Sequence, residues 1–181
     1  MKVIKTNLSG VLVIEPDIFT DQRGIFCESF SIKKYEDIGI TCKFVQDNVS
    51  VSKRNVIRGL HYQSPPYAQA KLVSVLKGKI LDVAVDIKRD SPTFGKYFSI
   101  ILESPLRNQL FIPEGYAHGF SVLSEEAIVY YKCSNFYSPS HERGIIWNDP
   151  IISIDWKVKS PIISDKDSCF PELSRQEDLF L

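Results

Sequence analysis

Short runs of β-branched and aromatic residues recur along the chain, and turn-forming residues separate them. Such runs lie at 11–14, 25–30, 71–76, 80–85, 97–102, 109–112 and 127–132. Many short strands at spacings of about 8–12 residues are typical of a β-sandwich or a β-barrel. The sequence therefore predicts an all-β fold.

The alternation within these runs adds detail to the prediction. In the run LDVAVDI at 81–87, the odd-numbered residues are all aliphatic and two of the three even-numbered residues are aspartates, as expected for a strand with unlike faces. Lys77-Gly78 precedes this run and predicts a β-hairpin, because glycine adopts a positive φ easily. A short helix is expected over 31–39 and a second near the acidic C-terminus. Without internal repeats, residues 1–181 are expected to form one domain.

Composition argues against several classes of protein. Lys plus Arg and Asp plus Glu both total 22, so a broad surface for nucleic acid or an anionic membrane is not expected. Apolar runs fall short of the ~20 residues that span a bilayer, and the N-terminus does not match a signal peptide. The four cysteines are far apart and contain no CxxC pair, which predicts reduced thiols. We therefore expect a cytoplasmic protein.

The three histidines are the first candidates for chemistry. His61 follows Arg58 by three residues in the strand-like segment NVIRGLHYQ; it is either a hydrogen-bonded core residue or part of a polar pocket inside the barrel. His118, in FIPEGYAHGF, either bonds to turn backbone or lines the same site, and His141 is expected at the surface. The acidic stretch SDKD at 164–167 is a surface turn unless the chain folds back, in which case its carboxylate could orient an imidazole.

A metal site is not expected. Small β-barrels of this kind often bind a metal between a carboxylate and two strand histidines separated by one residue. Here Gln63, a poor transition-metal ligand, takes the second position after His61, and Phe120 takes it after His118. The motifs GxGxxG, GxxxxGK[ST], GxSxG and HExxH are also missing. We therefore expect chemistry without a metal or a cofactor.

Two adjacent tyrosines supply a possible acid. Tyr130 and Tyr131 lie in one strand, so one of them points inward, either as a packed core residue or as a proton donor. A phenol beside a cation is the better donor. The candidate cations are Lys71, Arg58 and Lys132.

Together these segments resemble the dTDP-4-dehydrorhamnose 3,5-epimerase family, a cupin-type jelly roll. The resemblance covers nearly the whole chain in the family's order, through DQRGIFCESF, FVQDN, VIRGLHYQ, AKLV, GKILDVAVDIKRDSPTFG, FIPEGYAHGF, YKCSNFYSP, WNDP, IDW and ISDKD. It implies a double-stranded β-helix with a few short peripheral helices. It also implies a homodimer that inverts carbons 3 and 5 of dTDP-4-dehydro-6-deoxy-D-glucose, giving dTDP-4-dehydro-L-rhamnose without a cofactor.

The resemblance assigns roles to individual residues. It makes His61 the base, Asp167 its carboxylate partner, Tyr131 the opposing proton donor and Lys71 the cation near the substrate carbonyl. The residues that it assigns to substrate binding are Arg23, Phe26, Glu28, Gln46, Asn48, Arg58, His118, Tyr137, Glu142 and Lys166. Among these, Tyr137 is the aromatic that stacks on the nucleobase. Because N-terminal strands complete the neighbouring site in this family, some of these ligands are expected to act across subunits.

The expected reaction suits these residue types. A ketone at carbon 4 acidifies the hydrogens at carbons 3 and 5, a cation stabilises the enolate oxygen, and inversion needs an acid on the face opposite the base. Gln22, Ala70 and Pro65-Pro66-Tyr67 depart from the family pattern outside the catalytic set. The alternatives are a 3- or 5-epimerase for a related dTDP- or GDP-linked sugar, a metal-dependent cupin, and a non-catalytic sugar-binding jelly roll.

Overall fold

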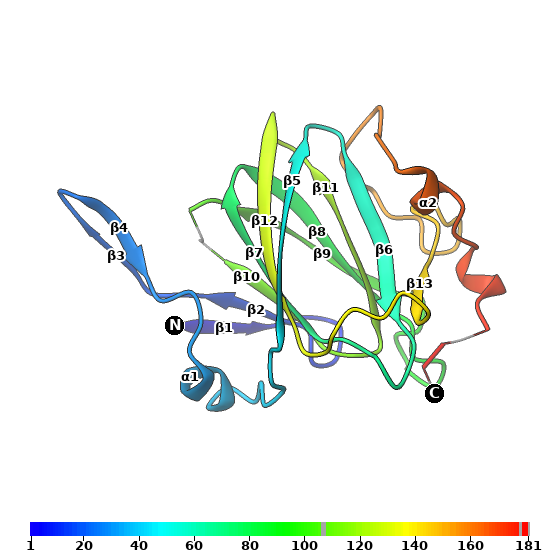
Figure 1. Ribbon diagram of the computed structural model, residues 1–181, viewed down its shortest axis with the longest axis horizontal. Helices are drawn as coiled ribbons and strands as arrows, with labels where there is room; N and C mark the ends of the chain where they lie inside the picture. The colour runs from blue at the N-terminus through cyan, green and yellow to red at the C-terminus, as the bar shows by residue number, and fades with distance from the viewer. Residues whose placement is uncertain (106–107, 178, 181) are drawn as a thin grey trace.

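Figure 1 shows the computed structural model, which describes residues 1–105, 108–177 and 179–180. Strands dominate this part of the chain. They are β1 (Lys2–Lys5), β2 (Leu12–Glu15), β3 (Ile18–Asp21), β4 (Gly24–Cys27), β5 (Gln46–Lys53), β6 (Ile57–Gln63), β7 (Lys71–Lys77), β8 (Lys79–Asp86), β9 (Tyr97–Glu103), β10 (Gln109–Ile112), β11 (Tyr116–Val122), β12 (Glu126–Cys133) and β13 (Glu142–Gly144). The helices are α1 (Ile32–Glu36), α2 (Asp165–Ser168) and a 3₁₀ turn at Leu173–Arg175. Among the described residues, none of these helices has the length and apolar character needed to cross a bilayer.

Most strands belong to two sheets that face each other. One sheet has the order β1-β2-β10-β7-β12-β5 and the other the order β13-β6-β11-β8-β9. The strands pair antiparallel with neighbours that are often distant in sequence, so the chain crosses repeatedly between the sheets as in a jelly roll. β3 and β4 form a separate hairpin that projects away from the two sheets (Figure 1).

The hairpin predicted at Lys77-Gly78 is wrong. β7 ends at Lys77 in the six-stranded sheet and β8 begins at Lys79 in the five-stranded sheet, so Gly78 carries the chain from one sheet to the other. The φ of Gly78 is 82°, and a Cβ at this position would lie 2.1 Å from the carbonyl oxygen of Glu126. This corner therefore requires glycine.

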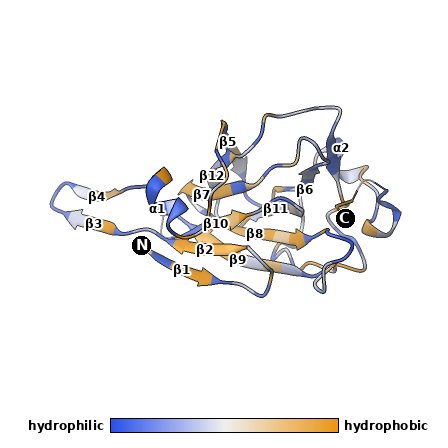
Figure 2. Ribbon diagram, turned by 90° about the horizontal axis from the view of Figure 1, so that it is seen from below, coloured by the Kyte–Doolittle hydropathy of each residue, from blue (hydrophilic) through white to orange (hydrophobic). Residues whose placement is uncertain are grey.

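Apolar side chains pack in three clusters, one between the two sheets and one on the outer face of each sheet. The main cluster lies between the sheets and includes Val73, Ala84 and Val129. A second covers the outer face of the five-stranded sheet with the C-terminal segment, and a third packs α1 against the six-stranded sheet. Apolar colour accordingly dominates β2, β8 and β10 in Figure 2. The alternation predicted for 81–87 is confirmed, but both faces of β8 are buried, so Asp82 lies in the interior.

Candidate active site

The space between the two sheets includes a polar cavity of about 210 Å³. It is formed where inward-facing side chains of β5, β6, β7 and β12 are polar instead of aliphatic. The residues that line it are Gln46, Asn48, His61, Tyr62, Gln63, Gln69, Lys71, Tyr131, Cys133, Tyr137 and Glu142. The cavity thus brings together half of the fourteen expected site residues: His61, Lys71, Tyr131, Gln46, Asn48, Tyr137 and Glu142.

His61 on β6 pairs with Asp167 on α2, 106 residues later. The His61 Nε2 atom lies 2.8 Å from Asp167 Oδ1, and Asp167 is 4% exposed. The segment 164–167 therefore folds back onto the barrel, with the Ser164 hydroxyl capping α2 by accepting from the Asp167 N–H. A carboxylate at Nε2 favours the tautomer in which this nitrogen carries the proton, leaving the Nδ1 lone pair free to accept another.

Asp167 is held as a carboxylate. Burial alone would raise its pKa, but the hydrogen bond and charge of His61, together with the Gly59 N–H, hold this pKa below its usual value. Gly59 donates to Asp167 Oδ2 over 3.0 Å. Its φ is 126°, and a Cβ there would approach Gly119 Cα to 2.5 Å. Only glycine fits this close strand contact and presents its N–H to the carboxylate.

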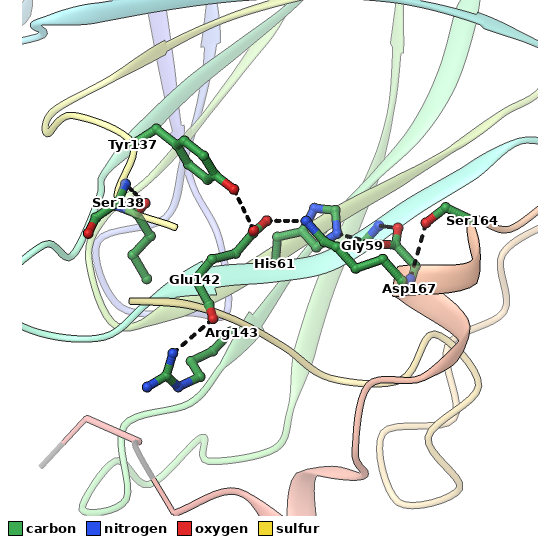
Figure 3. Close-up of polar contacts among 10 residues, drawn as sticks. Gly59, His61, Tyr137, Ser138, Glu142, Arg143, Ser164 and Asp167 are labelled. Atoms are coloured by element: carbon green, nitrogen blue, oxygen red, sulfur yellow. Dashed lines mark hydrogen bonds and ion pairs between the residues drawn. The ribbon is translucent and has the colours of Figure 1, made fainter. Parts of the chain in front are cut away.

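Glu142 joins three segments at the mouth of the cavity. Its two carboxylate oxygens accept from Lys166 Nζ at 2.5 Å and from the Tyr137 hydroxyl at 2.7 Å. In Figure 3 its side chain points toward the His61 ring from the side opposite Asp167. Burial would raise the pKa of Glu142, yet these two hydrogen bonds and the nearby His61 lower it. Glu142 is therefore an anion that orders the ring of Tyr137 and the ammonium of Lys166 beside His61.

Tyr131 is the inward member of the tyrosine pair. Its side chain lines the cavity, whereas Tyr130 on the opposite face of β12 donates to Asp47 and contacts Lys132. Burial raises the pKa of Tyr131, and the charge of Arg58 opposes that increase. The phenol therefore stays protonated near neutral pH, as an acid must. Lys132, one of the candidate cations, lies on the wrong face of the strand.

Lys71 lines the cavity from β7, whereas His118 is buried and lies outside the residues that line it. Burial lowers the pKa of Lys71, and the charges of Cys133, Asp82 and Glu142 partly oppose this effect. His118, which the sequence placed in a loop, lies within β11 and pairs in register with His61. Its Nε2 lies 2.8 Å from the buried Asp82, and burial lowers the pKa of His118 so that the ring is neutral.

The family model for dTDP-4-dehydrorhamnose 3,5-epimerase matches residues 5–175. The chain belongs to this family. The dTDP-4-dehydrorhamnose 3,5-epimerase of Shigella flexneri is 54% identical over 168 residues, which are 92% of this chain and 93% of that protein. The fold is accordingly the cupin-like jelly roll of its solved relatives.

Two solved structures bear on the reaction. The epimerase of Legionella pneumophila in complex with dTDP-4-keto-L-rhamnose has a TM-score of 0.94 and 47% identity, over 97% of this chain and 94% of that one. A 3′-monoepimerase from Streptomyces bikiniensis in complex with dTDP-quinovose has a TM-score of 0.88 and 32% identity, over 93% and 86%. The family thus includes proteins named for inversion at two carbons and at one.

Some residues expected at the epimerase site lie elsewhere in the single chain. Arg23 and Phe26 are on the projecting β3–β4 hairpin, where Arg23 pairs with Asp21, and Glu28 pairs with Lys34 just beyond it. Arg58 is exposed and donates to Ser52 at 3.0 Å, outside the residues that line the cavity.

Other cavity residues escaped the sequence analysis. Gln69 and Cys133 line the cavity without having been singled out, and Gln63 was considered only as an unsuitable metal ligand. A usable signal existed, because Gln63 and Cys133 each lie two residues from a predicted catalytic residue on the same strand, and such residues share a face.

Proposed function

We propose that this chain is an epimerase that inverts carbons 3 and 5 of dTDP-4-dehydro-6-deoxy-D-glucose to give dTDP-4-dehydro-L-rhamnose. The observation that carries the proposal is that His61, paired with Asp167, and Tyr131 come from facing sheets and line one cavity with Lys71. Such a cavity can hold a sugar ring between a base and an acid. The family to which the chain belongs supports the same reaction.

His61 is the proposed base. Its Nδ1 atom takes the proton from carbon 3 or carbon 5, and the electron pair of the broken C–H bond moves onto the ketone oxygen to form an enolate. Asp167 holds the ring and stabilises the imidazolium that results. Such a general base contributes typically ~10²–10⁴-fold to a rate.

Lys71 and Tyr131 are proposed to complete the cycle. The ammonium of Lys71 stabilises the charge that develops on the ketone oxygen. Although burial lowers the lysine pKa, an adjacent enolate favours its protonated form. Tyr131 then donates its phenolic proton to the opposite face of the carbon, and solvent reprotonates the tyrosinate and deprotonates the imidazolium. The net change is inversion, with no electrons gained or lost.

The mouth of the cavity is proposed to bind the nucleotide. Tyr137 offers an exposed ring for stacking on a base, and Lys166 offers a cation for the diphosphate. Gln46, Asn48 and Glu142 present amide and carboxylate groups to the sugar side of the same cavity. His118 and Arg58 complete the proposed binding set from the chain itself.

The decisive experiment follows product formation by proton NMR in heavy water, with dTDP-4-keto-6-deoxyglucose as substrate. We expect the 4-keto-L-rhamnose product with deuterium at both carbon 3 and carbon 5, because each inverted carbon receives its new hydrogen from solvent-exchanged residues. Inversion at a single carbon would instead identify a monoepimerase. A chain that binds the nucleotide without any exchange would be a sugar-binding protein.

The same assay tests independence from metal. The described residues contain no group of three or more His, Cys, Asp or Glu side chains arranged to hold an ion. The Nε2 atom of His61 is occupied by Asp167, and the amide of Gln63 is occupied by backbone. We expect unchanged turnover after exhaustive chelation. Turnover that disappears with chelator and returns with a divalent ion would contradict the proposed mechanism.

We further propose that the epimerase is a cytoplasmic homodimer. The β3–β4 hairpin exposes Phe19 (62%) and Phe26 (69%), which is unusual for large aromatic residues at the surface of a monomer. The edge strand β5 exposes Val49 (62%) and Val51 (57%), so each copy offers an apolar hairpin and an unpaired apolar edge. Arg23 and Phe26 would then reach the neighbouring cavity. The free thiols suit a reducing compartment.

Phe19→Asp tests the dimer. We expect a wild-type mass near twice 20.6 kDa by light scattering and a shift of the variant toward the monomer, since a carboxylate would be buried in the contact. Ile151→Asp, at a position 65% exposed and away from the hairpin, is the matched control and is expected to keep the wild-type mass. A monomeric wild type with full activity would refute the proposed assembly.

A further inference from the structure

Two loops beside the cavity are bound to each other along their length. The first, residues 64–70, follows β6, and the second, residues 134–141, follows β12 and carries Tyr137; we name them the paired loops. The Ser64 N–H donates to the His141 carbonyl at 3.0 Å, and the Gln69 amide donates to the Asn135 carbonyl at 2.7 Å. The rings of Tyr67 and His141 also lie 4.4 Å apart between centroids.

Gln63, the last residue of β6, lies at the centre of the paired loops. Its side chain is buried at 4% exposure. The Nε2 group donates to the carbonyls of Tyr67 (2.6 Å) and Phe136 (3.1 Å), and Oε1 accepts from the Ser138 N–H (2.7 Å). Two of these partners are the residues immediately before and after Tyr137. One amide therefore uses one donor and its acceptor on the backbone that flanks Tyr137, and its other donor on the Tyr67 carbonyl of the first loop.

We infer that Gln63 is a positioning residue that sets the nucleotide-binding ring of Tyr137 in place relative to the base His61. The inference rests on the proposed function, in which Tyr137 stacks on the nucleobase. Gln63 and His61 are two residues apart on β6, so their side chains point to the same face of a rigid strand. The strand that carries the proton-abstracting nitrogen of His61 therefore also holds the loop that carries the stacking ring of Tyr137.

The residue type matters as much as the position. An amide supplies two donors and an acceptor here; a carboxylate would face two carbonyl oxygens, and an aliphatic side chain would remove all three hydrogen bonds from these partly buried backbone groups. A further contact to this backbone, from the Tyr137 N–H to Gln46 Oε1 at 2.9 Å, comes from β5. If the Gln63 amide were lost, this contact to Gln46 would not restore the link between the two loops.

The test combines Gln63→Glu and Gln63→Leu with Tyr137→Ala in a double-mutant cycle. We expect each Gln63 variant to weaken dTDP binding by calorimetry about tenfold, and to raise KM similarly, because the stacking surface is displaced. At saturating substrate, kcat should stay within about twofold of the wild type. In the Tyr137→Ala background, either Gln63 substitution should weaken dTDP binding by less than about twofold, since the ring that it positions is gone.

Asp149→Asn is the matched control. Asp149 is also buried, and its carboxylate accepts from the backbone N–H groups of Ile151, Ile152 and Leu173, but it lies outside the cavity. The Asp149→Asn substitution should lower the unfolding temperature of the protein without changing its affinity for dTDP. If Gln63 variants lower kcat at unchanged KM, if their effect is additive with Tyr137→Ala, or if only the charged variant weakens binding, the inference is wrong. Wild-type protein that fails to bind dTDP would instead refute the proposed function.

Discussion

Replacing His61 with asparagine is expected to lower turnover by at least ~10²-fold while dTDP affinity stays near the wild-type value, because one side chain is proposed to supply general base catalysis. The His61 side chain is 29% exposed, so its replacement leaves no large apolar void. Steady-state kinetics with the NMR product assay give the rate, and calorimetry with dTDP gives the affinity. Near-wild-type turnover in His61→Asn would exclude this residue as the base.

Asp167→Asn should lower turnover in the same direction by a smaller factor. An amide can still accept from the Gly59 N–H, so the local backbone contact survives. It no longer stabilises the imidazolium, and its own N–H can favour the wrong tautomer of His61. Because the pKa of Asp167 is held low, the carboxylate is present throughout the neutral range in the wild type. A variant with larger losses than His61→Asn would indicate a structural role for Asp167.

The strands were predictable from the sequence, but their partners were not. Alternation at 81–87 identified β8 and its faces, since side-chain direction depends only on local backbone geometry. The connection that precedes β8 was predicted wrongly as a β-hairpin, because Gly78 suits both a hairpin turn within one sheet and a corner between two sheets. The Glu126 carbonyl that lies against Gly78 at this corner is 48 residues away in the chain, so the local sequence does not reveal the contact.

Two sources made part of the site predictable. One is the alternation of side chains within a single strand, and the other is the resemblance to the family. Strand parity requires one of Tyr130 and Tyr131 to face inward but does not say which; the family resemblance points to Tyr131, whose side chain lines the cavity. His61 and Asp167 are 106 residues apart, so spacing alone left 164–167 as a possible surface turn. The role of Gln63 depends on two loops that meet only in three dimensions.

Tyr131→Phe in heavy water is expected to separate proton abstraction from proton return. The variant keeps the base His61 and the cation Lys71, so the enolate should still form and its hydrogen should still exchange. Without the phenol, the opposite face lacks its donor, and His61 should return a deuteron to the original face. We therefore expect deuterium to enter the substrate faster than epimer appears, whereas His61→Asn should show neither process.

Tyr130→Phe is the matched control for the same experiment. Tyr130 differs from Tyr131 by one position in β12, and its hydroxyl donates to Asp47 on the outer face of the sheet. Removing that hydroxyl loses two hydrogen bonds, one donated to Asp47 and one accepted from Lys132, each of which contributes about 1 kcal/mol or less to stability. It leaves the cavity untouched. The control should epimerise at the wild-type rate. Normal epimerisation by Tyr131→Phe, or loss of turnover in Tyr130→Phe, would mean that another donor lies across the ring from His61.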